Sequence, residues 1–259
     1  MSLPHSALQY QRFRRLFFDN ESDTNTTTTI GQSDQSLILG NIGTLTKIHS
    51  SPNIWTVPNF LSDADIQFFQ DHIRKGGFKR SFVDRIDKEG SQSVNYDGEH
   101  RNSSFLCFQK RHNTRVAAIE RRAQDLFGVS NNDAVEPLQL VRYRSGEYFG
   151  RHHDLGDLDE ETGTVSLPPR NAFTKRRIAT IFCYVNDLPD GAGGETYFPE
   201  TNGGRGLAVL PKRGSAVIFS NVKLSPKGLG LVPDPSTIHE GRPVTRGIKY
   251  GLNIWICED

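Results

Sequence analysis

The chain has 259 residues, which suits one large domain, or one domain with appendages, and allows a sizeable core. Lys and Arg number 31 and Asp and Glu 30, so the net charge of +1 gives no global electrostatic reason to expect a nucleic acid or an anionic membrane as partner. The 3 cysteines are widely spaced, which excludes a C-x-x-C site and a disulfide framework and favours a reducing compartment.

The N-terminal part of the chain is predicted to be an extension of the folded domain. No segment reaches the roughly 18 apolar residues of a membrane span, and the first twenty residues lack the apolar core of a secretory signal. We therefore expect a cytoplasmic protein. Residues 1–52 form the extension, and the polar stretch 20–35 is expected to be flexible because it buries little. The folded domain is expected over 53–259.

Two amphipathic helices are predicted after a short strand at 54–58. The first helix begins at Ser62, a favourable N-cap, and ends at Gly76. The second runs from about 114 to 127 and is stopped by Gly128. In both segments the apolar residues recur at helical spacing, so each helix is expected to turn one face toward the core.

The chain is predicted to be rich in β-strands after Pro137. The candidate strands are 138–143, 178–185, 207–210, 215–219 and 249–257. Their short length and irregular spacing favour a β-sandwich or barrel that starts near Glu136, with the two helices packed against it, and therefore an α+β fold. The segment 155–175 shows little periodicity and is predicted to be a long flexible loop.

The sequence Arg151-His152-His153-Asp154 carries the first candidate for chemistry. Side chains alternate between the two faces of an extended strand, so His152 and Asp154 point to one side and His153 points to the other, toward solvent or the far side of the sheet. His152 and Asp154 can therefore bind one metal ion from a single face. An H-x-D pair alone is common by chance.

A third ligand and a cation follow near the C-terminus. His239 precedes a segment that we expect to form a hairpin, whose turn at 243–247 would return Lys249 beside it. Two histidines and one carboxylate with open positions opposite make the facial triad that suits non-haem Fe(II). A lysine beside such a centre can pair with the distal carboxylate of a dicarboxylic cosubstrate.

The motifs around these residues resemble the prolyl 4-hydroxylase branch of the Fe(II)/2-oxoglutarate dioxygenases. The resemblance spans about 53 to 257 and its blocks come in order. They are Arg101-Asn102-Ser103-Ser104; Leu138 to Tyr143 with Gly146, Phe149, His152 and Asp154; Arg177 to Asn186; Gly193-Gly194-Glu195-Thr196-Tyr197-Phe198-Pro199; Lys212 to Phe219; and His239-Glu240-Gly241-Arg242-Pro243-Val244 with Gly247, Lys249 and Trp255.

The resemblance implies a fold and an activity. It implies a catalytic domain at 53–259 with a double-stranded β-helix (jelly-roll) core over about 136–257, and with the N-terminal helices packed against its major sheet. It also implies hydroxylation of a peptidyl proline to 4-hydroxyproline with release of succinate and CO2, with Fe(II) as cofactor, 2-oxoglutarate as cosubstrate and ascorbate as a helper. The partner would be a proline-containing peptide or protein.

The resemblance also implies roles for individual residues. Iron would be held by His152, Asp154 and His239, and 2-oxoglutarate by Lys249, Tyr143, Tyr184 and Thr196. Substrate contacts would come from Arg101, Glu136, Phe149, Arg177 and Trp255. The last set has an alternative interpretation, in which its charged members form a structural ion pair and its aromatic members belong to the core.

Three departures from the family pattern leave the substrate open. Phe149 stands where many relatives carry tyrosine, Tyr250 where tryptophan is common, and Asn102 where threonine is usual. The paired cysteines of secretory relatives are also missing. A hydroxylase of a free amino acid or other small molecule therefore remains an alternative, followed by a non-catalytic binding module. A zinc hydrolase has the least support because no H-E-x-x-H is present.

Overall fold

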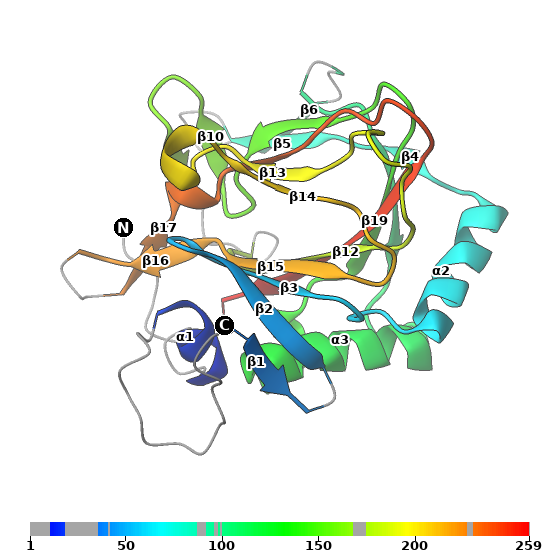
Figure 1. Ribbon diagram of the computed structural model, residues 1–259, viewed down its shortest axis with the longest axis horizontal. Helices are drawn as coiled ribbons and strands as arrows, with labels where there is room; N and C mark the ends of the chain where they lie inside the picture. Colours follow the sequence, from blue (N-terminus) through cyan, green and yellow to red (C-terminus); the bar gives the residue numbers. More distant parts are fainter. Residues whose placement is uncertain are drawn as a thin grey trace.

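The computed structural model describes residues 11–18, 36–40, 42–86, 92–95, 98, 100–167, 175–226 and 230–258. Within this part of the chain two β-sheets face each other, and the helices cover the outer face of the larger sheet (Figure 1). The α-helices of the described part are α1 (Gln11–Phe17), α2 (Asp63–Lys75) and α3 (Thr114–Phe127).

The major sheet is antiparallel and has nine strands. Across the sheet their order is β1 (Ser36–Leu39), β2 (Gly43–Ser50), β3 (Asn53–Val57), β15 (Ala216–Ser220), β12 (Arg177–Tyr184), β19 (Lys249–Cys257), β8 (Leu138–Tyr143), β7 (Ser104–Phe108) and β4 (Lys79–Arg80). The strands β12 and β19 lie side by side near the centre of the sheet, and the N-terminal strands β1 and β2 lie at one edge.

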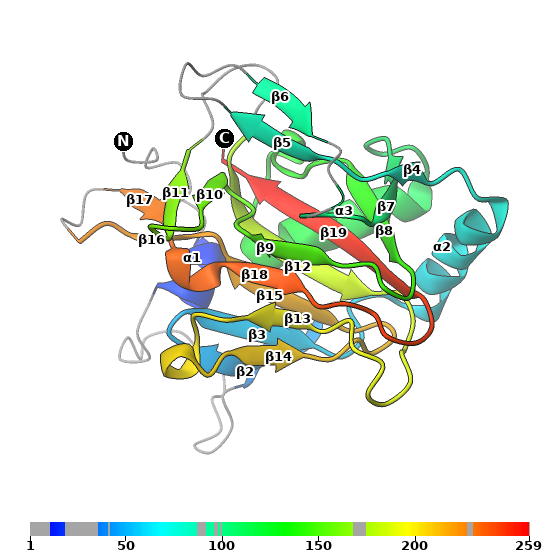
Figure 2. The ribbon, with the colours of Figure 1, turned by 90° about the horizontal axis from the view of Figure 1, so that it is seen from above.

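The minor sheet has four strands, which Figure 2 shows in front of the major sheet. Their order is β14 (Leu207–Val209), β13 (Thr196–Phe198), β18 (His239–Gly241) and β9 (Phe149–His152). Three two-stranded ribbons complete the described strands: β5 (Val83–Ile86) with β6 (Gln92–Asn95), β10 (Asp157–Asp159) with β11 (Thr164–Ser166), and β16 (Val222–Leu224) with β17 (Leu231–Pro233).

The helix ends form as the sequence predicts. Ser62 Oγ accepts from the backbone N–H of Asp65 at 3.2 Å, while Asp65 Oδ2 accepts from the N–H of Ser62 at 2.9 Å, which completes a capping box. At the end of α3, Gly128 has a φ of 70°, the left-handed conformation that glycine adopts without steric cost. The predicted N-cap at Ser62 and the stops at Gly76 and Gly128 are confirmed.

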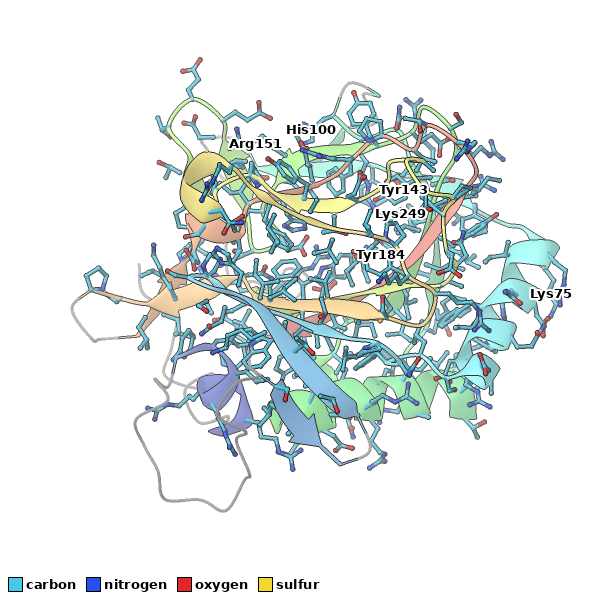
Figure 3. The ribbon with its side chains drawn as sticks, viewed as in Figure 1. Lys75, His100, Tyr143, Arg151, Tyr184 and Lys249 are labelled. Carbon is cyan, nitrogen blue, oxygen red and sulfur yellow. The ribbon has the colours of Figure 1, made fainter. Side chains whose placement is uncertain are left out.

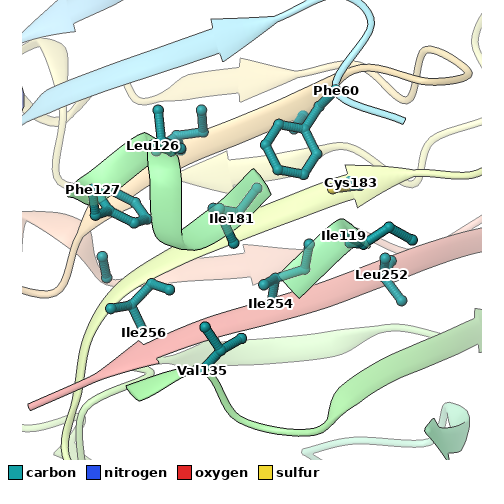
Figure 4. Close-up of a cluster of buried hydrophobic side chains, with 14 of the residues drawn as sticks. Phe60, Ile119, Leu126, Phe127, Val135, Ile181, Cys183, Leu252, Ile254 and Ile256 are labelled. Atoms are coloured by element: carbon teal, nitrogen blue, oxygen red, sulfur yellow. The ribbon is translucent and has the colours of Figure 1, made fainter. Parts of the chain in front are cut away.

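The central strands of the major sheet are buried on both faces, which explains their near-continuous apolar runs. In β19, Leu252, Ile254 and Ile256 pack toward the helices (Figure 4), where they meet residues such as Ile119 and Phe127. The alternate residues Lys249, Gly251, Asn253 and Trp255 face the minor sheet, where a second apolar cluster lies between the sheets. Because side chains alternate along a strand, one face of β19 contributes to the core and the other faces the site.

The predicted β-strands agree closely with the observed ones. The ranges 138–143 and 249–257 coincide with β8 and β19, and the other predicted strands differ from observed strands by one or two residues at their ends. The segment 155–175, predicted to be a long flexible loop, contains two paired strands in its first part, because β10 and β11 pair there with Asp157 opposite Ser166. Residues 168–174 lie outside the described residues.

The segment that precedes residue 53 joins the same sheet. Strand β2 pairs with β3 from Thr46↔Thr56 to Ser50↔Asn53, and β1 pairs with β2. The predicted boundary between an extension at 1–52 and the domain at 53–259 stays a prediction, and the predicted flexible stretch 20–35 lies outside the described residues. In the described part of the chain, no helix combines the length and the apolar character needed to cross a membrane.

Candidate metal and cosubstrate site

Three side chains that the sequence singles out meet between the two sheets. His152 ends β9, Asp154 lies in the turn that follows, and His239 begins β18, where it is the register partner of His152. One donor atom from each residue lies within 4.8 Å of the others. His152 Nε2 is 3.6 Å from Asp154 Oδ1, and His239 Nε2 is 3.8 Å from Asp154 Oδ2.

Both imidazoles are oriented by backbone carbonyls. His152 Nδ1 lies 2.8 Å from the carbonyl of Gly150, and His239 Nδ1 lies 3.0 Å from that of Thr237. Because a carbonyl only accepts, each Nδ1 carries the proton and each Nε2 presents its lone pair to the centre of the site. The rings are therefore already in the tautomer that a metal ion requires.

Electrostatics favour neutral imidazole and ionised carboxylate here. Burial, reinforced by the neighbouring His239, lowers the pKa of His152 well below its ordinary value. Burial acts to raise the pKa of Asp154, but His239, His152 and Arg177 outweigh it and hold that pKa well below its ordinary value. Around neutral pH the site thus offers one carboxylate and neutral imidazole nitrogen.

This donor set fits Fe(II). Donor atoms about 2 Å from one ion lie roughly 3 to 4 Å apart. His152 Nε2 and Asp154 Oδ1 are 3.6 Å apart, and the three residues each offer a donor atom within 4.8 Å of the others. Two imidazole nitrogens and one carboxylate on one side of a pocket make the two-histidine, one-carboxylate arrangement of non-haem iron oxygenases. His152, Asp154 and His239 could hold the ion and leave the side facing the pocket open.

The carboxylate of Asp154 has further partners on the major sheet. Thr180 Oγ1 donates to Asp154 Oδ2 at 2.7 Å, and the indole Nε1 of Trp255 donates to the same oxygen at 3.1 Å. Thr180 lies on β12 and Trp255 on β19, directly opposite each other in the register. The two central strands of the major sheet therefore set the direction of the carboxylate that the β9 turn supplies.

Lys249 lies at the start of β19, away from Trp255, which contacts Asp154 from the other end of the same strand. Aromatic rings surround its ammonium group. It is 2% exposed, and its Nζ lies 4.9 Å from the ring centroid of Phe182, 5.2 Å from that of Tyr143 and 5.6 Å from that of Tyr184. Figure 3 shows Tyr143, Lys249 and Tyr184 together between the two sheets. Burial lowers the pKa of Lys249 to about 7, although the charge of Glu195 acts to raise it.

The described residues provide Lys249 with no ion pair. A buried ammonium without a carboxylate partner is costly, and an anionic ligand group beside it would remove that cost. Lys249 and the triad line one pocket, so an anionic group bound at the lysine would lie in the same pocket as the metal ligands. Residues of both sheets line it: Tyr143, Phe149, His152, Asp154, Thr180, Phe182, Thr196, Phe219, His239, Glu240, Gly241, Lys249, Asn253 and Trp255.

The route by which Lys249 reaches the site differs from the sequence prediction. His239 and Lys249 do not lie on the two strands of one hairpin: β18 pairs with β13 and β9 in the minor sheet, whereas β19 pairs with β12 and β8 in the major sheet. The chain crosses from one sheet to the other between them. Lys249 therefore faces His239 from the opposite layer, as the register partner of Tyr143.

Of the remaining predicted cosubstrate residues, Tyr143 and Thr196 line this pocket, and Tyr184 is fully buried next to Thr196. The Tyr184 hydroxyl donates to Thr196 Oγ1 at 2.8 Å, which joins β12 of the major sheet to β13 of the minor sheet. A Cβ on Gly251 would lie 2.2 Å from the ring of Phe182, so only glycine at this position of β19 allows that ring to lie over it. The structure thus brings Tyr143, Tyr184 and Thr196 to the same end of the pocket as Lys249.

The five predicted substrate residues form two groups at the site. Phe149 stacks on the imidazole of His152, and the guanidinium of Arg101 lies 4.3 Å from the ring centroid of Phe149. In the second group, Arg177 makes a two-fold ion pair with Glu136 at 2.8 and 2.9 Å and lies 3.6 Å from the ring centroid of Trp255. Contact of either group with a peptide stays a prediction.

His153 points away from the triad, as strand alternation predicts, but it does not reach solvent. It is 5% exposed; its Nε2 donates to the carbonyl of Asp234 at 3.0 Å and its Nδ1 accepts from the N–H of Leu155 at 3.2 Å. Burial lowers the pKa of His153 to about 4. This neutral imidazole fastens the turn that carries Asp154 to the segment that precedes His239.

Sequence reasoning missed two polar residues at the site. Thr180 carries a signal that could have identified it, because it shares a strand face with Tyr184 at even spacing. Asn221 carries none. It is fully buried, its Nδ2 donates to Thr180 Oγ1 at 3.0 Å, and only the tertiary fold brings it there.

Comparison with known proteins agrees with this geometry. The family model for the 2OG-Fe(II) oxygenase superfamily matches residues 138–257. Human prolyl 4-hydroxylase subunit alpha-1 is 32% identical over 207 residues, covering 80% of this chain and 35% of the relative. Prolyl 4-hydroxylase 5 of Arabidopsis thaliana is 28% identical over 214 residues, covering 76% of this chain and 65% of the relative. The chain thus spans about a third of the length of the first of these relatives.

Solved structures share the fold. The 2OG complex of viral collagen prolyl hydroxylase from Paramecium Bursaria Chlorella virus-1 superposes with a TM-score of 0.55 at 23% identity, covering 81% of this chain and 98% of the other. A prolyl hydroxylase of Trichoplax adhaerens, solved with a hypoxia inducible factor peptide fragment, gives 0.52 at 14% identity, covering 79% and 83%. The expected double-stranded β-helix fold is confirmed by this likeness.

Proposed function

We propose that the chain is a 2OG-Fe(II) oxygenase that hydroxylates a peptidyl proline with Fe(II) and 2-oxoglutarate, because the superfamily model matches residues 138–257 and prolyl 4-hydroxylases are among its relatives. The observation that carries the proposal is the pairing of the His152, Asp154 and His239 cluster with the buried Lys249 in one pocket. The cluster supplies the metal ligands, and the lysine supplies a charge that only an anionic ligand would satisfy.

The metal ligands and Lys249 have separate roles in this reaction. Iron and 2-oxoglutarate, when bound, supply the oxidising chemistry that consumes dioxygen, releases succinate and CO2 and places one oxygen atom on a C–H bond. His152, Asp154 and His239 hold the ion. Lys249 binds the distal carboxylate of 2-oxoglutarate, which fixes the direction in which the 2-oxo acid end points toward the ion.

The aromatic and hydroxyl groups around Lys249 position the cosubstrate. The rings of Tyr143 and Phe182 exclude water from the ammonium, so that its attraction to a carboxylate is stronger than in solvent. Tyr184 and Thr196, which are hydrogen-bonded to each other, offer hydroxyl groups at the same end of the pocket. The substrate proline approaches from the side where Phe149 and Trp255 line the pocket.

The peptide substrate is supported by the relatives and by the two groups of charged and aromatic residues. Arg101 with Phe149, and Glu136 with Arg177 and Trp255, offer guanidinium and ring surfaces to an extended chain. Ascorbate is expected to sustain turnover, as the family resemblance implies.

Turnover of defined substrates tests the proposal. The purified chain is supplied with Fe(II), 2-oxoglutarate, ascorbate and proline-rich peptides, and succinate is measured beside the peptide mass. We expect succinate in proportion to a peptide heavier by one oxygen atom, with fragment masses that place the oxygen on proline. Formation of succinate with free proline but not with peptides would identify a small-molecule hydroxylase instead. Peptide binding without iron-dependent turnover would identify a binding module.

A further inference from the structure

The two oxygens of Asp154 have different surroundings. Oδ2 accepts from Thr180 Oγ1 at 2.7 Å and from Trp255 Nε1 at 3.1 Å. A carboxylate oxygen has about two lone-pair sites, so these two donors occupy Oδ2. Among the described residues, Oδ1 accepts no hydrogen bond and lies on the side of His152. Oδ2 is thus hydrogen-bonded to the protein, and Oδ1 is available to bind a metal ion.

The direction of the Thr180 hydroxyl is itself determined by Asn221. A hydroxyl has a single proton, and Thr180 Oγ1 accepts from Asn221 Nδ2 at 3.0 Å. With that acceptor site in use, the proton is left to point at Asp154. The same Nδ2 also donates to the carbonyl of Arg177 at 3.1 Å. Because a carbonyl only accepts, the amide nitrogen of Asn221 must face this side, and the amide cannot flip without losing both bonds.

Asn221 is in turn held rigidly. It is fully buried between β15 and β16, its backbone N–H donates to Ile178, and its backbone carbonyl accepts from Asp234 at 3.1 Å. Asp234 also receives the bond from His153. Asn221 therefore connects β12, which carries Thr180, to the segment that leads into His239. In the described part of the chain, Asn221 Oδ1 is the one buried side-chain nitrogen or oxygen atom without a hydrogen-bond partner. The two bonds that Nδ2 donates offset the energetic cost of burying this oxygen.

From this geometry we infer that Thr180 and Asn221 are positioning residues, which keep Asp154 Oδ2 engaged so that the carboxylate binds the metal ion through Oδ1 alone. The inference rests on the proposed function. A carboxylate bound through both oxygens would occupy one more position on the ion. With one oxygen of Asp154 and two imidazole nitrogens as ligands, the protein would fill three of about six coordination positions. The other three would be left for a bidentate cosubstrate and dioxygen.

Cobalt binding to the apo chain provides a test that does not depend on turnover. Co(II) is titrated into the wild-type chain and into Thr180→Val, Thr180→Ser and Asn221→Leu, and the visible absorption of the bound ion reports its number of ligand atoms. Supporting groups of this kind typically change metal affinity by about 10- to 100-fold. We expect Thr180→Val to weaken Co(II) binding to that extent with an altered absorption band, and Asn221→Leu to do so to a smaller extent.

The controls separate positioning from general stability. Thr180→Ser retains the hydroxyl and should bind Co(II) within about threefold of wild type with the same spectrum, given the size of the effect expected from losing the group. Thr201→Val is the matched control, because Thr201 is also buried and donates a 2.8 Å bond, but to the carbonyl of Phe198. It should bind Co(II) as wild type does. If Thr180→Val does not fold, as judged by its melting temperature, Thr180→Ala replaces it.

Wild-type affinity and an unchanged spectrum in both Thr180→Val and Asn221→Leu would overturn the inference while the proposed function stands. A wild-type chain that binds neither Co(II) nor Fe(II) would overturn both. Weaker binding in Thr180→Val with recovery in Thr180→Ser supports the inference, whatever substrate the chain hydroxylates.

Discussion

The phenyl ring of Phe149 lies flat on the imidazole of His152, with 3.6 Å between ring centroids and 11° between planes. The two residues lie on the same strand, β9, and the guanidinium of Arg101 covers the other side of the phenyl ring. Together with the Nδ1 bond to Gly150, this stack holds the imidazole in one orientation. The aromatic ring of residue 149, and not a hydroxyl on it, is what contacts the proposed metal ligand.

Replacing Phe149 should therefore weaken metal binding without abolishing it. An aromatic contact of this kind contributes about 0.5–1.5 kcal/mol, so Phe149→Ala should raise the dissociation constant of Co(II) by roughly 2- to 10-fold. Phe149→Tyr keeps the ring and should bind Co(II) as wild type does. Both constants are measured by titration calorimetry of the apo chain, and equal affinity in Phe149→Ala would show that the stack has no orienting effect.

Substitution of adjacent histidines should separate a ligand from a structural residue. His152→Ala should abolish measurable Fe(II) and Co(II) binding while the chain stays folded, because the side chain faces the open pocket. His153→Ala should instead lower the free energy of unfolding by about 2–4 kcal/mol, because it removes a buried ring, leaves the Leu155 N–H without its partner and breaks the bond to the Asp234 carbonyl.

Metal titration and denaturant unfolding of the two histidine variants measure these effects. At a temperature where His153→Ala is folded, it should still bind the ion. The reverse pattern, with His153→Ala losing the ion and His152→Ala keeping it, would contradict the assignment of faces along β9.

Removing the buried charge at Lys249 should stabilise the apo chain and prevent cosubstrate binding. Lys249→Met keeps a side chain of similar length but no ammonium to bury, so the melting temperature should rise, most clearly at pH 6, where the lysine is charged. The dissociation constant for 2-oxoglutarate should rise about 100-fold or more, as for loss of one partner of a buried ion pair.

For Lys249→Met, scanning calorimetry of the apo chain measures the melting temperature, and titration calorimetry in the presence of Co(II) measures the dissociation constant of 2-oxoglutarate. Lys212→Met, at an exposed lysine on the loop before β15, is the control and should change neither. A melting temperature that falls in Lys249→Met would mean that the ammonium is satisfied in the apo protein.

The affinity for 2-oxoglutarate should fall as the pH rises above about 7. Burial lowers the pKa of Lys249 to about 7 in the free protein, whereas a bound carboxylate raises it again. Below pH 7 the lysine is already charged and binding takes up no proton. Above pH 7 binding must protonate it, and the affinity decreases by up to about tenfold per pH unit until the pKa of the complex is reached.

Proton uptake can be measured directly. At pH 8, titration calorimetry in buffers of different ionisation enthalpy should show uptake approaching one proton for each 2-oxoglutarate bound, and little uptake at pH 6. The carboxylates of 2-oxoglutarate stay ionised over this range. Lys249→Arg should remove the pH dependence, because a guanidinium stays charged throughout. Proton uptake that persists in Lys249→Arg would show that a group other than Lys249 takes up the proton.

The lowered pKa of Lys249 also affects how the stability of the folded chain depends on pH. The pKa of Lys249 lies below its unfolded value of 10.5, so between about 7 and 10.5 the unfolded chain binds more protons than the folded one. This group therefore makes the apo chain more stable as the pH rises through that window. Comparing the pH dependence of unfolding in wild type and Lys249→Met isolates the contribution.

The sequence by itself determined the helices α2 and α3 and the strands β3, β8, β12, β14, β15 and β19, and it singled out candidate side chains for the site. Local signals were sufficient for this, because capping residues set the ends of α2 and α3, and alternation selected His152 and Asp154 over His153. The order of the family motifs was enough to name Lys249 and the fold. Capping and alternation depend on residues close together in the chain, and the family motifs are each read from a short segment.

Only the tertiary structure decided which sheet each residue enters and which groups lie behind the ligands. His239 and Lys249 are ten positions apart, yet they belong to opposite sheets, because β18 and β19 pair with strands distant in sequence. Thr180 and Asn221 meet Asp154 for the same reason. Hydrogen bonds between distant segments depend on how the layers stack, and a pattern along one strand carries no information about the strand that faces it.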